Sequence, residues 1–219
     1  MSELKTTKIY SALEEKLNVI SHGIGFLLSI SALVLLVIRS SLYGNAYHVV
    51  SFTIFGSSLV VLYAASTLYH NSKKEKVRAR LNIFDHASIF ILIAGTYTPY
   101  VLVSLNGLMG WILFGITWGA AAIGVTLKIF YIGKYEKLST VLYVLMGWII
   151  IIAIKPLIEN LPTEGLFWLF TGGISYTIGA VLFSLKRLKL NHAIFHFFVL
   201  IGSVSHFISI YFYVLQISD

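Results

Sequence analysis

Apolar residues fall into seven long runs along the chain, separated by short polar connections. A run of about 20 apolar residues is what an α-helix needs to cross the hydrocarbon core of a bilayer. The pattern therefore predicts an all-α, polytopic membrane protein, in which a seven-helix bundle (residues 19–219) follows a polar tail (residues 1–18). The predicted spans are 19–38, 47–70, 83–104, 109–129, 138–156, 163–185 and 192–215.

The composition agrees with this assignment. The 219 residues are 58% hydrophobic and only 11% charged, whereas soluble domains are about half apolar and a quarter charged. A water-soluble fold of this size could not bury so much apolar surface. The chain has no cysteine, so a metal site would have to use histidine and carboxylate ligands.

The basic residues predict the orientation. Fourteen of the 16 Lys and Arg residues lie in the N-terminal tail or beside the second, fourth and sixth connections, and only Arg39 and Lys155 lie on the other side. Positively charged loops stay in the cytoplasm, so we expect a cytoplasmic N-terminus and an external C-terminus. The net charge of +7 is spread over four juxtamembrane segments, which indicates contact with anionic membrane lipids and not with nucleic acid.

This topology is directly testable. An epitope tag after Asp219 should be accessible to an impermeant reagent on intact cells, and a tag before Met1 only after the membrane is opened. The reverse accessibility would show that the charge asymmetry had been misread.

Ionisable side chains inside spans are costly and usually face the protein interior. His70 ends the second span, Asp85 begins the third, and His192 and His196 begin the seventh. All four are therefore predicted to lie at the cytoplasmic ends of their helices. Ser66 and His70 are four residues apart, as are His192 and His196, so each pair shares one helix face.

This arrangement predicts a metal site. Three imidazoles suit Zn²⁺, and a fourth position left to water is typical of catalytic zinc. Asp85 is expected to orient a histidine, to hold the bound water or to ligate directly. If the site is hydrolytic, Asp85 is the candidate general base and Ser66 the candidate hydrogen-bond donor to the tetrahedral intermediate.

A second polar set, Glu15, Asn18 and His22, lies on one face of the helix that enters the first span. Two interpretations are equally supported, namely a polar network that braces the metal site and a solvated juxtamembrane turn.

The remaining polar features are interpreted as structural. His48 and His206 lie towards the outer side, with His206 too far along its helix to share the site, and His86 points away from Asp85 or supports it from behind. Pro99 predicts a kink in the third span, stabilised by neighbouring hydroxyl groups; a polar pocket wall is the alternative.

The sequence resembles the bacterial hemolysin III-type proteins of the progestin and adipoQ receptor superfamily. The likeness extends over nearly the whole chain. Its motifs are ExxNxxxH (Glu15, Asn18, His22), SxxxH (Ser66, His70) followed by Asp85 in "FDHASIF", "GTYTPY" in the third span, and HxxxH (His192, His196).

The resemblance implies a seven-helix bundle in a bacterial plasma membrane, with Zn²⁺ held by His70, His192 and His196 and with Asp85 nearby. It also implies kinship with membrane hydrolases, including alkaline ceramidases. Three functions follow as hypotheses. They are a zinc-dependent hydrolase of lipid-like amides or esters, a cytolytic or membrane-homeostasis protein with structural zinc, and a sensor or receptor without catalysis.

Overall fold

The computed structural model describes residues 10–131 and 134–216 and is all-helical over them. Residues 1–9 of the predicted tail and 217–219 at the C-terminus lie outside the described residues. Within the described chain, seven helical segments are long and apolar enough to cross a membrane, which confirms the predicted fold class; the orientation stays a prediction. The elements are α1 (Ala12–Tyr43), α2 (Ala46–Asn71), α3 (Glu75–Pro99), the π-helix η1 (Tyr100–Ser104), α4 (Gly107–Tyr131), α5 (Glu136–Gly147), the 3-10 helix η2 (Ile149–Ala153), α6 (Ile154–Asn160), α7 (Thr163–Ser184), α8 (Asn191–Ser209) and the π-helix η3 (Ile210–Val214).

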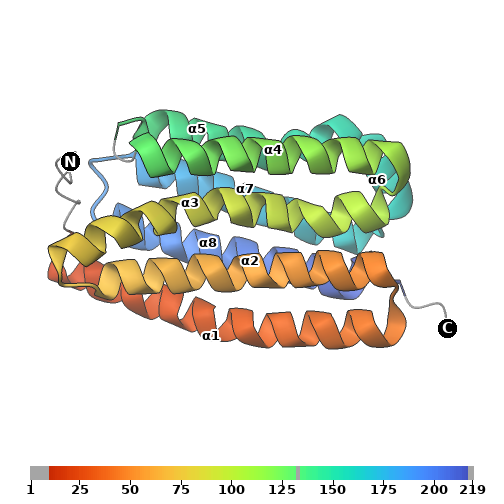
Figure 1. Ribbon diagram of the computed structural model, residues 1–219, viewed down its shortest axis with the longest axis horizontal. Helices are drawn as coiled ribbons and strands as arrows, with labels where there is room; N and C mark the ends of the chain where they lie inside the picture. Colours follow the sequence, from red (N-terminus) through yellow and green to blue (C-terminus); the bar gives the residue numbers. More distant parts are fainter. Residues whose placement is uncertain (1–9, 132–133, 217–219) are drawn as a thin grey trace.

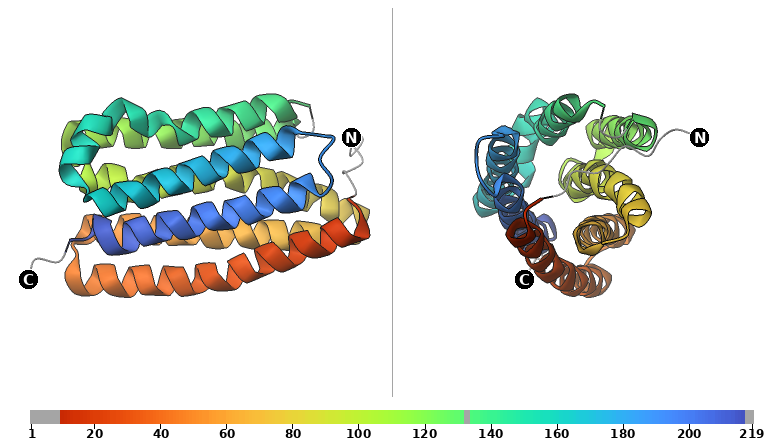
Figure 2. Two further views of the ribbon diagram at one scale, coloured as in Figure 1. Left: turned by 180° about the vertical axis from the view of Figure 1, so that it is seen from behind. Right: turned by 90° about the vertical axis from the view of Figure 1, so that its left-hand side faces the viewer.

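The long helices run side by side along the length of the molecule (Figure 1). Seen end-on they form a ring (Figure 2), which closes where α8 packs against α1. The third span is the most enclosed, with 83% of its most apolar window buried. We call the end at which α1, α3 and α8 begin the basic end, because the loop residues Lys73, Lys74, Lys186, Arg187 and Lys189 lie there.

The first helix begins earlier than the predicted span. Ser11 is its N-cap, and the Ser11 hydroxyl accepts a hydrogen bond from the backbone N–H of Glu14 at 3.2 Å. Acidic residues in a first turn also interact favourably with the helix dipole. Residues 12–18 are therefore helical, and this extension carries Glu14 and Glu15 to the site described below.

The fifth span is not one continuous helix. It changes from α5 to the 3-10 helix η2 and then to α6. Pro156, in the first turn of α6, has no N–H to donate and crowds the preceding turn. The Tyr97 hydroxyl donates to the Gly147 carbonyl at 2.8 Å and accepts from the Ile150 N–H at 2.9 Å. These two bonds satisfy backbone groups at the break, as a membrane interior requires.

The end of α3 also differs from the expectation. The helix continues past Pro99 as a π-helical turn, and the hydroxyls of Thr96 and Thr98 donate to the carbonyls of Leu92 and Ala94. These are not the carbonyl that Pro99 leaves without its usual donor. Thr96 and Tyr97 line a cavity, so this segment forms a pocket wall.

Candidate metal centre

Three buried histidines come together at the basic end. His70 belongs to the last turn of α2, whereas His192 and His196 belong to the first two turns of α8. Each offers a ring nitrogen, and these three atoms lie within 4.8 Å of one another. The Nε2 atoms of His70 and His192 are only 3.1 Å apart. The structure thus brings together the three predicted ligands from two helices that are distant in sequence.

The other ring nitrogens of this pair have oxygen partners. His70 Nδ1 lies 2.7 Å from Glu15 Oε2, and His192 Nδ1 lies 3.0 Å from the Tyr10 hydroxyl. An ionised carboxylate only accepts hydrogen bonds, so the His70 proton resides on Nδ1 and the Nε2 lone pair is left for a ligand. Burial raises the pKa of Tyr10 above its usual range, so its hydroxyl stays neutral and can accept from His192 Nδ1–H.

This geometry fits a metal ion. If Nδ1 carries the proton on both rings, two Nε2 lone pairs face each other across 3.1 Å, an arrangement that a cation between them would stabilise. Two imidazoles bound tetrahedrally to one zinc, with Zn–N of about 2.0–2.1 Å, place their nitrogens about 3.3 Å apart. Oxygen partners on the outer nitrogens are the usual support for metal-binding histidines.

A partly buried ion pair supports His70 from behind. Glu15 pairs with Arg78, whose guanidinium stacks over the Tyr69 ring at 4.5 Å and donates to the Tyr69 carbonyl at 3.3 Å. The Asn18 side-chain amide lies 3.3 Å from His70 Nδ1. Because the carboxylate is held by both Arg78 and His70, it fixes the orientation of the imidazole.

The start of α8 is tied down by two contacts. The Glu14 carboxylate accepts the backbone N–H of His192 at 3.1 Å, which satisfies one of the donors that a helix N-terminus leaves free. The Asn191 side chain donates to the Phe183 carbonyl at the end of α7, at 2.8 Å. Leu190, just before the helix, has a left-handed backbone with φ of 58°, so the chain turns sharply into the first histidine ligand.

His22 completes the surroundings of the third histidine. Its ring stacks on His196 with centroids 3.5 Å apart and planes inclined by 8°, and its edge meets the Tyr63 ring. Asn18 and His22 are both buried. The placement of the ExxNxxxH residues around the cluster favours a polar network over a solvated turn.

Asp85 is outside the group of three ring nitrogens. It is buried, lies near Ser66, and lines the same cavity as His192 and His196. His86 Nδ1 is 3.7 Å from Asp85 Oδ2 and also contacts the Asn82 carbonyl at 2.9 Å. Ser66 is buried near Asp85 and is not among the residues that line the cavity.

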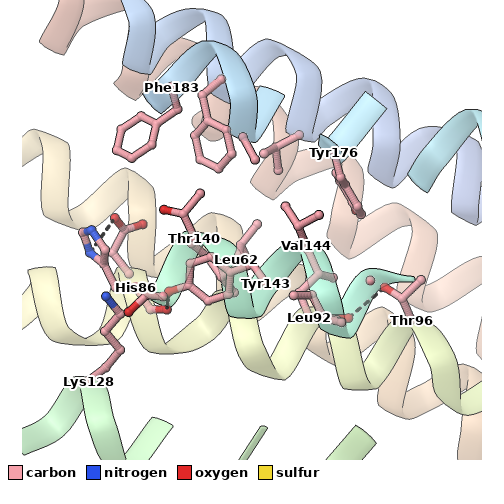
Figure 3. A pocket seen from close by; sticks show the side chains of 18 of the residues that line it. Leu62, His86, Leu92, Thr96, Lys128, Thr140, Tyr143, Val144, Tyr176 and Phe183 are labelled. Atoms are coloured by element: carbon pink, nitrogen blue, oxygen red, sulfur yellow. Dashed lines mark hydrogen bonds and ion pairs between the residues drawn. The ribbon is translucent and has the colours of Figure 1, made fainter. Parts of the chain in front are cut away.

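The cavity has a volume of about 490 Å³ and extends from the cluster along α3, α5, α7 and α8. Figure 3 shows His86 and Lys128 at one end of it, apolar side chains such as Leu62 and Val144 along its middle, and Tyr176 and Thr96 at the far end. A long space with an apolar middle suits a lipid chain. The site therefore joins a metal-competent cluster to an apolar chamber.

Sequence reasoning missed three residues of this centre. Tyr10 and Glu14 lie in the predicted tail, and Arg78 was counted only as an orientation residue. The Ser11-to-Glu14 spacing is a helix-start signal that would have extended the first helix to Glu14. Nothing in the sequence pattern connects Tyr10 to His192 or Arg78 to Glu15.

The Tyr10 contact leads to a prediction. Tyr10→Phe keeps the ring but removes the hydroxyl that is hydrogen-bonded to His192 Nδ1. We expect zinc affinity, measured by competition with a chelator, to fall about 10- to 100-fold. Tyr47→Phe, at an exposed ring on the opposite end, should leave the affinity unchanged. Equal affinity in Tyr10→Phe and wild type would rule out this supporting role.

Taken together, these features define a polytopic membrane protein of seven spans with a buried histidine cluster able to hold a metal ion. The chain belongs to the haemolysin-III related family, whose profile matches residues 10–207. It is a multi-pass protein of the bacterial cell membrane.

Among curated proteins, Hemolysin-3 of Bacillus cereus is 47% identical over 215 residues, covering 98% of both chains. The Hemolysin-3 homolog of Bacillus subtilis (strain 168) is 46% identical over 209 residues, covering 95% of this chain and 98% of that protein. The monocyte to macrophage differentiation factor of Homo sapiens is 28% identical over 145 residues, or 64% of this chain and 60% of that protein.

Proposed function

We propose that this protein is a zinc-dependent hydrolase of lipid-like amides or esters in the membrane. The observation that carries the proposal is that two histidines of the cluster, His192 and His196, line a cavity that a buried carboxylate, Asp85, also lines. A substrate in the cavity would place its scissile group near the histidines and its acyl chain along the apolar wall.

Zinc at such a site supplies a Lewis acid that activates water and polarises a carbonyl at neutral pH. The protein side chains have separate tasks. His70, His192 and His196 bind the ion, while Glu15 and Tyr10 hold the outer nitrogens of His70 and His192.

Asp85 is assigned the role of general base, which accepts a proton from the attacking water. Asp85 lines the same cavity as His192 and His196 and lies outside the group of three ligands, which favours contact through water over direct ligation. Ser66 lies near Asp85 and does not line the cavity, so we assign it the task of positioning the Asp85 carboxylate. The apolar lining excludes bulk water from the reacting group and favours membrane lipids as the source of substrate.

A second function is supported by a relative's name. The Bacillus cereus protein is called Hemolysin-3, so a membrane-active protein with a structural zinc site is the competing proposal.

A product screen distinguishes the two. Purified protein in nanodiscs is incubated with N-acyl and O-acyl lipids, and released fatty acid is measured by mass spectrometry. If the protein is a hydrolase, wild type should release free fatty acid and Asp85→Ala should not. If wild type releases no fatty acid from either class of lipid, the structural alternative is favoured.

A further inference from the structure

Two lysines line the cavity at its polar end. Lys128 belongs to the last turn of α4, and Lys134 lies in the connection between α4 and α5. Figure 3 shows the Lys128 side chain extending from α4 toward His86. Among the described residues that line the cavity, these two cations are accompanied by one carboxylate, Asp85. The described lining of this end therefore carries more positive than negative charge.

The burial of Lys128 is unusual for a lysine at the end of a membrane span. Its side chain is 3% exposed, whereas Lys73, Lys74 and Lys76 at the same end of the molecule are exposed. A lysine near a membrane surface normally extends its flexible stem so that the ammonium group reaches water. A cation in the last turn also interacts favourably with the helix dipole, but an exposed lysine would do the same. Its position in the cavity wall is therefore better explained by a role inside the cavity.

Lys134 has a complementary position at the mouth of the cavity. It is exposed and also lines the cavity, so its side chain can be reached from outside. Its Nζ lies 6.0 Å from the centroid of the Tyr131 ring and 5.3 Å from that of the Tyr135 ring. Such cation–π contacts hold a flexible side chain in place. The mouth thus presents a positioned cation to a molecule that enters it.

The order of the groups along the cavity indicates which part of a substrate would meet the lysines. Apolar side chains such as Leu62 and Val144 line its middle, and Lys128 lies beside His86 at one end. A lipid with its acyl chain along the apolar middle and its scissile group at Asp85 would place its remaining part at this end. That part is the headgroup.

We propose that Lys128 and Lys134 recognise an anionic headgroup, either a carboxylate or a phosphate, on the lipid that is hydrolysed. The proposal rests on the proposed function, and it names the substrate class as acyl lipids with a negatively charged headgroup. An ammonium group has three donors, so Lys128, which also interacts within the protein, can still donate to a headgroup oxygen. Hydrogen bonds between two ionised groups are the strong ones, and salt screens buried pairs less than exposed pairs.

The test uses three amides with the same oleoyl chain. N-oleoylglycine carries a carboxylate, N-oleoyl phosphoethanolamine carries a phosphate, and N-oleoylethanolamine carries a neutral hydroxyl. In each hydrolysis, water gives its hydroxyl to the acyl carbon and its proton to the nitrogen while the C–N bond breaks, which releases oleic acid and the free amine. The measurement is kcat/KM for release of oleic acid by the full-length, zinc-loaded protein in phosphatidylcholine nanodiscs, whose lipids carry no net charge.

We expect wild type to prefer at least one anionic amide over the neutral amide by about 10- to 100-fold in kcat/KM. Lys128→Met keeps the length of the side chain but removes its charge, and should lower this preference about tenfold. Lys134→Met should lower it only about threefold, because an exposed ammonium group is screened by water and salt. Lys128→Arg keeps the charge and should keep most of the preference.

The matched control is Lys76→Met. It removes one positive charge from an exposed position at the same end, and Lys76 is not among the residues that line the cavity. The preference should therefore equal that of wild type. Partitioning of each amide into the bilayer is the same for all variants and so cancels in the comparison. Zinc content, measured on every variant, reports that the metal centre has folded.

Three results would overturn the inference. If wild type hydrolyses the neutral amide as well as both anionic ones, the headgroup charge is not recognised, and the proposed hydrolase still stands. A preference that persists in the double variant Lys128→Met, Lys134→Met would place headgroup recognition elsewhere. Hydrolysis of none of the amides would overturn the inference, and the proposed function would fall with it if the ester lipids of the product screen are not cleaved either.

Discussion

Replacing His192 and His196 together by alanine should abolish metal binding. Wild-type protein is expected to contain one zinc per chain, and the double variant close to none, because one remaining imidazole does not hold zinc against water and chelators. The measurement is elemental analysis of purified protein after dialysis, with the expected change from about one equivalent to less than about 0.1.

The matched control is His48→Ala together with His206→Ala. It removes the same number of imidazoles, from positions that lie outside the cluster, and should leave the zinc content unchanged. Circular dichroism on both double variants checks that the helices are intact. Unchanged zinc in His192→Ala, His196→Ala would show that the ligand assignment is wrong.

The second prediction distinguishes the role of Asp85 from that of the histidines. Asp85→Asn has nearly the same shape, and the three imidazoles remain, so zinc content should stay close to that of wild type. Lipid hydrolysis should fall at least about 100-fold, because an amide cannot accept the proton. His70→Ala should lose both zinc and activity.

The comparison also identifies the type of site. If Asp85→Asn loses zinc as completely as His70→Ala does, then Asp85 is a direct ligand. The site would be closed by four protein groups, as structural zinc sites are, and the membrane-active alternative would be preferred. Retained zinc with unchanged hydrolysis would remove Asp85 from the proton transfer.

The histidine cluster shows how far sequence alone reaches. His70, His192 and His196 were predicted to lie at one depth because each is an ionisable residue at the same end of an apolar run. That argument uses only the position of a residue along its own helix. It could not show that the Nε2 atoms of His70 and His192 approach to 3.1 Å, because the distance depends on how α2 packs against α8.

His206 shows the same limit. Its distance along the helix excludes it from the cluster, as predicted. Whether a buried imidazole finds a partner depends on the neighbouring helices. Here Gly172 admits the ring against α7 while Tyr176 directs its hydroxyl at Ser203, and these facts are invisible in a hydrophobicity pattern.

The sequence by itself determined the seven spans, their shared polar end and the three histidines, because a bilayer imposes length and polarity on each helix separately. Only the tertiary structure decided which groups support the ligands. Tyr10 and His192 are 182 residues apart, and Arg78 meets Glu15 across 63 residues. Such contacts arise where helices that are distant in the sequence meet in the bundle, and no periodicity within one helix encodes them.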